Sequence, residues 1–315
     1  MKGLILRNPG ELFYEEFPSP IPQSGEALIA VKAVGICGSD LAAYLGSHPW
    51  CKGPIILGHE VVGEIVEVKS DGKTQFAVGD LVAIDPVVEC GHCYPCRIGR
   101  YNCCSQMKII GIDLNGGLAQ YLVAPLHRLH KIPQGMSVER GVLCEPLSVG
   151  AQAINRAHLH PADFVVIMGG GPIGLCTLLM AKTQKITVVV ADYVPERLVL
   201  ATSLGADAVL NLQEQNIAEV VMEMTKGEGA NVVVEASGTV QGTETALEIA
   251  SAGSRIIIVG LTKKPTPFLG ATLVKKEMSI IASRLNTNLF PSTLQVLANP
   301  EFPAEKLITH QASFE

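Results

Sequence analysis

A glycine motif at residues 169–174 most narrowly limits how this chain can fold. Gly169, Gly171 and Gly174 stand in the G-x-G-x-x-G positions, directly after the apolar run 164–168 and at the start of a helical stretch. Glycines at these positions allow a tight turn, the approach of a pyrophosphate to the backbone, and close packing of the helix on the strand. The motif therefore predicts a dinucleotide-binding unit, with phosphate at the N-terminus of the helix.

Strands and helices alternate throughout the region after residue 162. We expect strands at residues 164–168, 186–191, 207–210, 231–235, 255–260 and 279–282, and helices at residues 172–184, 195–204, 217–225 and 242–252. Such alternation is typical of a parallel, doubly wound α/β sheet. The earlier residues instead contain short β-type runs separated by glycine and proline turns. The sequence thus predicts a β-rich domain at 1–150 and an α/β domain at 151–285.

Charge and composition exclude several classes of function. Acidic residues outnumber basic ones by 30 to 24, which argues against nucleic acid as a partner. The uncharged stretch 164–181 resembles a membrane span, but its central glycines and proline favour a strand, turn and helix, so we expect no membrane partner. We also expect no signal peptide, because the apolar stretch before Arg7 is too short. Together with the clustered cysteines, this favours metal binding in the cytoplasm over disulfides.

Asp192 bears on the choice of nucleotide. It stands 18 residues after Gly174, at the end of the second predicted strand, where a carboxylate would accept hydrogen bonds from the ribose hydroxyls. The same carboxylate would repel a 2′-phosphate. Arg197, five residues further on, would either hold such a phosphate or be a solvated helix residue. We predict NAD rather than NADP.

Five cysteines gather in the first domain and indicate a structural zinc site. Cys90, Cys93 and Cys96 form a C-x2-C-x2-C pattern, and Cys103 and Cys104 follow. Four thiolates close a tetrahedral zinc site with no open position. Spacing alone does not choose between Cys103 and Cys104 as the fourth. Unrelated free cysteines and a zinc-ribbon nucleic-acid module are the rival interpretations, and the acidic charge disfavours the second.

Three further pieces indicate an open metal site. They are Cys37 within 35–40, the pair His59 and Glu60, and Glu145 within 144–150. A thiolate, an imidazole and a carboxylate form a suitable set for a zinc ion that keeps one position for substrate. Each piece alone is weak, because a single cysteine is more often a core residue. Their occurrence together, ahead of a dinucleotide motif, carries the hypothesis.

In this order, the pieces resemble those of the zinc-dependent medium-chain alcohol/polyol dehydrogenases. The resemblance implies a GroES-like catalytic domain, a Rossmann NAD domain and two zinc ions per chain. It matches Cys37, His59 and Glu60 to zinc-site residues of the sorbitol and threonine dehydrogenase branches. Glu145 stands where alcohol dehydrogenases often have a cysteine ligand, so the choice between Glu60 and Glu145 as the direct ligand stays open. In the structural-zinc lobe, at about 86–108, the family's spacing selects Cys104 and leaves Cys103 free.

A narrower resemblance concerns the substrate. The stretches 83–96, 282–288 and 306–310 look like those of the bacterial starvation-sensing dehydrogenase branch, which is similar to L-gulonate 5-dehydrogenases and L-galactonate dehydrogenases. This implies a sugar acid, such as L-gulonate, L-idonate or L-galactonate. Arg284 is the candidate for binding its carboxylate, since a guanidinium does so bidentately. A cofactor contact and a salt bridge to an active-site glutamate are the competing roles.

The implied reaction is the oxidation of a secondary hydroxyl, with hydride transfer to NAD, to give a keto acid. Zinc acts as a Lewis acid, Ser39 accepts the first proton, and Glu60 takes part in catalysis. The resemblance adds Pro172, Ile173, Gly260 and Leu261 to the cofactor contacts. A sorbitol-type polyol dehydrogenase or an L-threonine dehydrogenase is the alternative within the class. A non-catalytic NAD-binding sensor is the alternative outside it.

Two departures from the family and one assembly prediction remain. Ala42 stands where many members have a histidine that ends a proton relay, and we expect His48 to be a loop histidine rather than its substitute. Residues 286–315 are expected to return toward the catalytic domain, as a segment shorter than the family's. The apolar stretch 254–261 would lie at or near the far edge of the sheet, which favours a homodimer or homotetramer.

Overall fold

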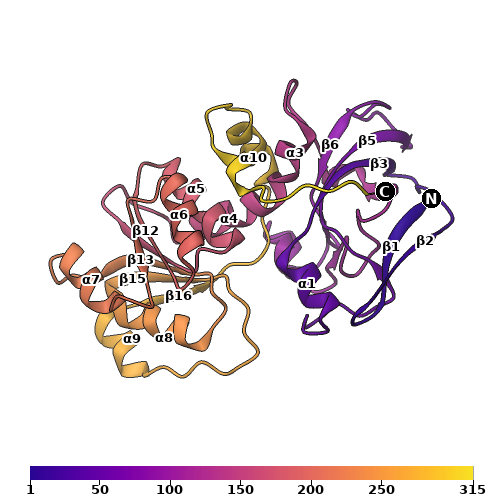
Figure 1. Ribbon diagram of the computed structural model, residues 1–315. Coiled ribbons are helices and arrows are strands. Elements are labelled where there is room, and N and C mark those ends of the chain that lie inside the picture. Colours follow the sequence, from indigo (N-terminus) through magenta and orange to yellow (C-terminus); the bar gives the residue numbers. More distant parts are fainter. Residues whose placement is uncertain (315) are drawn as a thin grey trace. The chain divides into compact units, whose positions relative to one another are not determined.

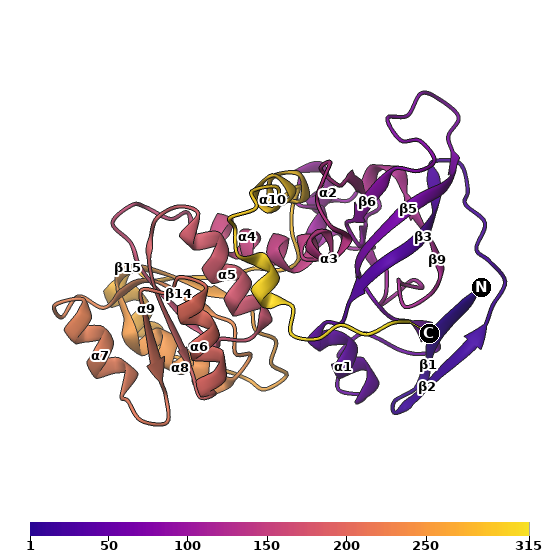
Figure 2. The same ribbon diagram turned by 45° about the horizontal axis from the view of Figure 1, so that its top comes forward.

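Residues 1–314 are described by the computed structural model, which Figures 1 and 2 show as a ribbon in two orientations. The chain divides into two units, each with its own core. The first unit consists of Met1–Glu145 with Thr287–Phe302, and the second consists of Pro146–Asn286 with the residues from Pro303 onward. The segment 286–315, expected to return as one piece, is thus shared between the units.

The first unit is built on antiparallel sheets. A five-stranded sheet has the order β10-β6-β5-β3-β9, a three-stranded sheet the order β2-β1-β4, and β7 pairs with β8. The strands are β1 Lys2–Asn8, β2 Glu11–Glu16, β3 Glu26–Gly35, β4 Ile55–Ile56, β5 Glu60–Lys69, β6 Leu81–Ile84, β7 Val87–Val88, β8 Lys108–Ile109, β9 Tyr121–Pro125 and β10 Leu129–Lys131. Alternate residues of β3 and β9 face a buried apolar core that includes Ile29, Ile65 and Leu122.

The first unit also contains short helices. They are α1 Gly38–Tyr44, α2 Tyr94–Arg97, α3 Val138–Val142 and α10 Phe290–Leu297, with the 3-10 helices η1 Tyr101–Cys103 and η2 Leu126–Arg128. Arg140 of α3 binds the end of α10, because its guanidinium donates to the carbonyl oxygens of Leu297, Asn299 and Phe302 at 2.5–2.8 Å. This buried contact fixes the segment Thr287–Phe302 within the first unit.

The second unit is a six-stranded parallel sheet of the predicted doubly wound type. Its order is β13-β12-β11-β14-β15-β16, the 3-2-1-4-5-6 arrangement of dinucleotide-binding folds. The strands are β11 Phe164–Met168, β12 Thr187–Asp192, β13 Ala208–Asn211, β14 Ala230–Glu235, β15 Ala250–Ile258 and β16 Ser279–Ala282. Apolar runs such as that of β12 are buried on both faces, as expected for a parallel sheet.

Helices cover both faces of this sheet. In Figure 1, α5 and α6 lie on one face, and α7 and α8 on the other. The helices are α4 Cys144–Ala157, α5 Pro172–Lys182, α6 Pro195–Ser203, α7 Ile217–Met224, α8 Val240–Ile249 and α9 Gly270–Lys276, with the 3-10 helix η3 Ala304–Leu307. Within residues 1–314, none of the helices has both the length and the apolar character that crossing a membrane requires. The stretch 164–181 is divided between β11 and α5.

The region around residue 250 differs from the expectation. The helix predicted at 242–252 ends at Ile249, and β15 begins at once and continues through Gly253, which has a positive φ of 69°. The stretch 254–261, expected at or near the sheet edge, lies next to it, because β15 pairs with β14 on one side and with the last strand, β16, on the other. The edge strand is therefore β16. Helix α9, which the sequence analysis did not predict, lies between these two strands in the chain.

Candidate active site and metal centres

Three side chains converge where β3 ends and β5 begins. Ligand atoms of Cys37, His59 and Glu60 all lie within 4.8 Å of one another. Cys37 caps the N-terminus of α1, whereas Glu60 is the first residue of β5 and pairs with Gly35 of β3. A Cβ atom at Gly35 would overlap the Glu60 carboxylate, so this carboxylate occupies space that only a glycine leaves. Glu145, which the sequence left as an alternative ligand, is buried but is not a member of this group.

The donor set fits a zinc ion. His59 is 6% exposed, and its Nδ1 atom has no hydrogen-bond partner of good geometry. Its Nε2 atom lies 3.4 Å from Ser39 Oγ. A buried imidazole, a thiol and a carboxylate that point at one small space are costly unless they share a positive centre. They are also the ligand types that zinc prefers at an open site.

Asp40 belongs to this site, although the sequence analysis gave it no role. Its carboxylate accepts the backbone N–H of Cys37 at 2.9 Å and that of Gly58 at 3.4 Å, and it lies 3.6 Å from His59 Nδ1. The side chain is 5% exposed. Carboxylates that hold a metal-binding imidazole in this way fix its orientation. The available signal was an acidic residue three positions after Cys37, at N3 of a short helix.

Burial and mutual charge shift the pKa values of this cluster. Burial alone lowers the pKa of His59, but the adjacent Asp40 carboxylate and Cys37 side chain outweigh it and raise the pKa well above its usual value. Burial raises the pKa of Glu60, and it raises that of Glu145 to about 8 with help from the negative charge of Glu60. Such perturbed carboxylates are typical of functional sites.

The four-cysteine lobe forms a second, closed group. Sγ atoms of Cys90, Cys93, Cys96 and Cys104 lie within 4.8 Å of one another, whereas Cys103 is exposed and outside the group. Cys93 Sγ is 3.4 Å from Cys96 Sγ and 3.8 Å from Cys104 Sγ. A tetrahedral zinc ion with Zn–S bonds of about 2.3 Å requires sulfur–sulfur distances of about 3.8 Å.

Backbone amides around the lobe favour the thiolate form. The N–H groups of Cys90 and Gln106 donate to Cys104 Sγ, both at 3.3 Å. Hydrogen bonds from the N–H groups of Cys96 and Ser105 lower the pKa of Cys93 to about 5, whereas burial and the adjacent Cys93 raise that of Cys96 to about 12. Since the thiolate is the form that binds metal, the lobe fits a structural zinc ion.

The glycine motif has the conformation that its sequence predicts. Gly169, directly after β11, has a φ of 103°, and a Cβ atom at Gly174 would overlap the Gly169 carbonyl oxygen. Gly171 caps α5, and no atom lies within 4 Å of where its Cβ would be. Pro172 is exposed at the first turn, followed by Ile173. The open N-terminus of this helix is a cradle suited to a pyrophosphate.

Asp192 lies over this loop at the end of β12. Its Oδ2 atom accepts the N–H of Gly170 at 2.7 Å, and its Oδ1 atom accepts that of Val194 at 2.8 Å. Arg197 Nη1 lies 3.4 Å from the same carboxylate, with half of its side chain exposed. Arg197 is thus a partly exposed partner of Asp192.

The other candidate cofactor and substrate residues also follow the strands of the parallel sheet. Gly260 lies just beyond β15, where a Cβ atom would overlap the backbone of Gly238, and Leu261 beside it is 69% exposed. Arg284 is exposed just beyond β16. All three thus lie at the carboxyl ends of strands, which is the edge where doubly wound sheets bind ligands.

His48 does not have the features of a relay group. Its Nδ1 atom accepts the backbone N–H of Cys51 at 2.8 Å and that of Trp50 at 3.3 Å. The ring also packs edge-on against Trp50, with centroids 6.0 Å apart. The imidazole therefore stabilises its own loop.

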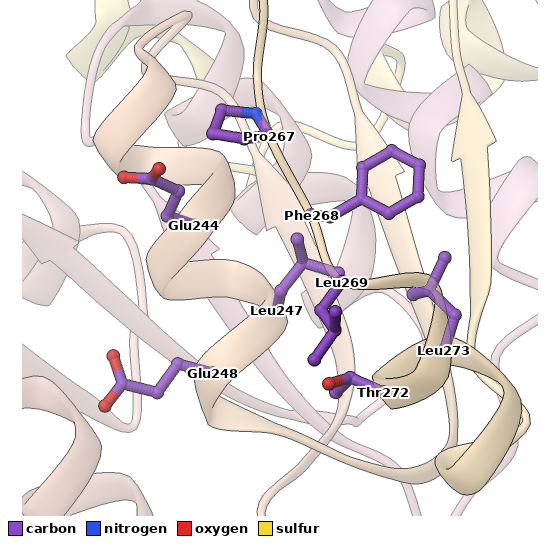
Figure 3. A pocket seen from close by; sticks show the side chains of 8 residues that line it. All are labelled: Glu244, Leu247, Glu248, Pro267, Phe268, Leu269, Thr272 and Leu273. Atoms are coloured by element: carbon purple, nitrogen blue, oxygen red, sulfur yellow. The ribbon is translucent and has the colours of Figure 1, made fainter.

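A groove in the second unit contains none of these residues. It has a volume of about 240 Å³ and lies between α8, the loop before α9, and α9 itself. Figure 3 shows Leu247 and Leu269 pointing toward one another, with the carboxylates of Glu244 and Glu248 pointing away from the apolar side chains.

Both units match models of known families. Residues 23–134 match the alcohol dehydrogenase GroES-like domain, and residues 172–299 match the zinc-binding dehydrogenase domain. These matches confirm the GroES-like and Rossmann classes expected from the sequence.

Relatives extend over the whole chain. The starvation-sensing protein RspB of Escherichia coli is 35% identical over 100% of this chain and 93% of its own length. A sorbitol dehydrogenase of Bacillus subtilis is 36% identical over 100% and 91%, and an L-galactonate-5-dehydrogenase of E. coli is 33% identical over 100% and 92%. The crystal structure of rspB from E. coli CFT073, complexed with NADH, superposes with a TM-score of 0.92 at 35% identity, and covers 97% of this chain and 90% of that one.

Proposed function

This chain belongs to the zinc-binding alcohol dehydrogenase family and is a zinc- and NAD-dependent oxidoreductase, and from this premise we propose that it oxidises a secondary hydroxyl of a sugar acid to a ketone. L-gulonate, L-idonate and L-galactonate are the proposed substrates. The convergence of Cys37, His59 and Glu60 beside the Ser39 hydroxyl carries the proposal. The similarity to an L-galactonate-5-dehydrogenase supports a sugar acid.

Cys37, His59 and Glu60 would hold the catalytic zinc ion. When bound, zinc supplies a Lewis acid that makes the substrate hydroxyl more acidic. Asp40 keeps the Cys37 loop in place through a partly buried hydrogen bond, and its carboxylate lies 3.6 Å from His59 Nδ1. Glu145 is a further buried carboxyl near these ligands, and burial together with the negative charge of Glu60 raises its pKa.

Ser39 is the proposed acceptor of the first proton. Its hydroxyl lies at the N-terminus of α1, 3.4 Å from His59 Nε2, and is thereby directed toward the cluster. Ala42, one turn further along α1, offers no imidazole to continue the relay. We therefore propose that the proton leaves Ser39 through a cofactor ribose hydroxyl or ordered water.

The second unit would hold NAD, whose nicotinamide supplies the hydride acceptor. Gly169, Gly171 and Gly174 shape the loop for the pyrophosphate, and the Asp192 carboxylate accepts from the ribose hydroxyls. Arg284 is proposed to bind the substrate carboxylate, and Gly260 and Leu261 to contact the cofactor. Cys90, Cys93, Cys96 and Cys104 would hold the structural zinc ion.

A panel of substrates tests this proposal. Purified, zinc-loaded protein is mixed with NAD and with L-gulonate, L-galactonate, L-idonate, sorbitol or L-threonine in turn, and NADH absorbance is followed. We expect the highest kcat/KM for one of the sugar acids. A higher value for sorbitol would favour the polyol alternative, which the sorbitol dehydrogenase relative supports. A higher value for threonine would favour the amino-acid branch.

We further propose a homodimer or homotetramer that acts in the cytoplasm. The edge strand β16 exposes Ile280, and the neighbouring α9 and its preceding loop expose Val274 and Leu269. Apolar side chains beside an unpaired strand edge favour pairing with a second copy. The cysteines of the described residues form no disulfide, which supports a reducing compartment. Sedimentation showing a stable monomer at micromolar concentration would contradict the assembly.

A further inference from the structure

A buried polar network lies beside the four-cysteine lobe and includes none of its proposed ligands. Tyr101, in η1 between Cys96 and Cys104, is 7% exposed. Its hydroxyl donates to Asp85 Oδ2 at 3.1 Å and accepts the backbone N–H of Asn288 at 2.7 Å. One phenol therefore links the lobe to a segment 187 residues away in the chain.

Arg128 holds this network from the five-stranded sheet. Its guanidinium lies 3.9 Å from the centroid of the Tyr101 ring, and its Nη1 atom donates to Asp85 Oδ2 at 3.0 Å. Its Nε atom donates to Glu89, the residue directly before Cys90, also at 3.0 Å. Arg128 and Asp85 are 4% and 1% exposed, so these hydrogen bonds form where water cannot replace them. One buried cation thus contacts both the start of the lobe and Tyr101 within it.

The segment that Tyr101 holds extends to the catalytic cluster. Asn288 adopts a left-handed conformation, with φ 55°, just after the chain re-enters the first unit. Two residues later, the carbonyl oxygen of Phe290 accepts a hydrogen bond from the Cys144 thiol at 3.7 Å. Cys144 directly precedes Glu145.

We propose that Tyr101 is a positioning residue that couples metal binding in the four-cysteine lobe to the placement of the segment Thr287–Phe302. Zinc in the lobe fixes Tyr101 between Cys96 and Cys104, and Tyr101 in turn fixes the Asn288 amide. The coupling is reciprocal, because a segment stabilised by the metal must stabilise metal binding to the same extent. This inference rests on the proposed zinc site of the lobe.

The test uses the zinc-loaded protein and its Tyr101→Phe variant. Elemental analysis first establishes two zinc ions per chain in both proteins, which tests the lobe assignment separately. Release of the lobe zinc to a colorimetric chelator and hydrogen exchange of the backbone amides are then measured. We expect Tyr101→Phe to release the lobe zinc several-fold faster and to raise exchange at 287–302. Exchange in β3 and β5 should stay at the wild-type level.

Tyr94→Phe is the matched control, because this tyrosine belongs to the same lobe but is 65% exposed. It should behave as the wild type in both measurements. Arg140→Lys weakens the hydrogen bonds that hold the C-terminal end of the segment 287–302, and it should also speed release of the lobe zinc. In a protein that already carries Tyr101→Phe, it should add little to this effect.

Wild-type zinc release in a folded Tyr101→Phe protein would overturn the proposal. So would a rise in exchange spread evenly over the first unit, which is the result expected of a merely structural side chain. Additive effects of Tyr101→Phe and Arg140→Lys would overturn it independently. If Tyr101→Phe does not fold, Arg140→Lys alone decides, because an unchanged zinc release then refutes the coupling.

Discussion

Asp40 Oδ1 lies 3.6 Å from His59 Nδ1, and both side chains are almost completely buried. The same carboxylate fixes the backbone of the Cys37 loop. Asp40 thus holds two of the three proposed ligands without being one of them. We expect Asp40→Ala to weaken zinc binding at the catalytic site about 10–100-fold, the range seen when such supporting groups are removed. Equilibrium dialysis against a zinc buffer measures the loss. Unchanged affinity would show that Asp40 is only a helix-capping residue.

The two metal sites should respond differently to loss of a ligand. Cys93→Ser should unfold or aggregate the protein, because a structural zinc ion contributes folding free energy. His59→Ala should leave a folded protein that binds NAD and is inactive. Elemental analysis and circular dichroism of both variants check this contrast. Fully active enzyme with at most one zinc ion per chain would exclude the two-site interpretation.

Asp192→Ala should weaken NAD binding far more than NADP binding. The lost hydrogen bonds to the ribose hydroxyls should cost about 1.5–3 kcal/mol, the range for bonds to charged groups. Arg197→Gln serves as a control, since Arg197 is a partly exposed partner of the carboxylate. It should change the preference between NAD and NADP less than Asp192→Ala does. A wild-type kcat/KM that already favours NADP would contradict the role given to Asp192.

Ser39→Ala should lower kcat by roughly 10²–10⁴-fold, the span expected when a positioned proton-transfer group is lost. His48→Ala should leave the pH profile of kcat unchanged, because the imidazole accepts backbone hydrogen bonds in its own loop. The comparison of wild type with His48→Ala over pH 5–9 is decisive. A displaced acid limb in the variant would assign the end of the relay to His48.

His130 should make the first unit less stable in mild acid. Burial and the nearby Arg128 lower the pKa of His130 to about 4, and its ring stacks on Phe290 with centroids 5.0 Å apart. An unfolded histidine titrates near 6.5, so the unfolded chain takes up the proton first. Stability is therefore retained above about pH 6.5 and falls as the pH approaches 4, by at most about 3 kcal/mol.

Melting temperatures of wild type and His130→Phe between pH 7.5 and 5, with zinc in excess, measure the contribution of His130 to the pH dependence of stability. The variant should lose less stability on acidification. His127→Gln is the matched control, since His127 is 59% exposed and lies three residues earlier. If the melting temperatures of wild type and His130→Phe fall equally on acidification, His130 is not the source of the acid sensitivity.

The sequence predicts those features of the fold that depend on neighbouring residues better than those that depend on contacts between distant segments. The glycine turn at 169–174 is set by its own backbone, and the alternating pattern of the second unit follows from period and length. The role of Asp40 could not be predicted from the sequence, because its burial depends on how β3, α1 and β5 pack together. The position of 254–261 next to the sheet edge was predictable, because only one further strand, at 279–282, follows it in the alternating pattern.

The proposed metal ligands also depend on contacts between distant segments. Cys37 and His59 are separated in the chain, and only the register that pairs Gly35 with Glu60 brings them together. The resemblance to a family grouped these residues at one metal site, but only the structure shows the register. Within the lobe, spacing left Cys103 and Cys104 equal, and the fold of η1 directs only Cys104 to the other thiols.

The first unit is made of two segments that are far apart in the chain, and this determines where the protein can be truncated or recombined. Because Thr287–Phe302 belongs to it, an expression product that ends at Glu145 would lack the three carbonyl oxygens that accept the hydrogen bonds of Arg140. A chimaera that exchanges nucleotide domains with a relative therefore needs three junctions, near residues 145, 286 and 302. A chimaera with a single crossover would combine segments of the first unit from two different parents, however well the two parental sequences align.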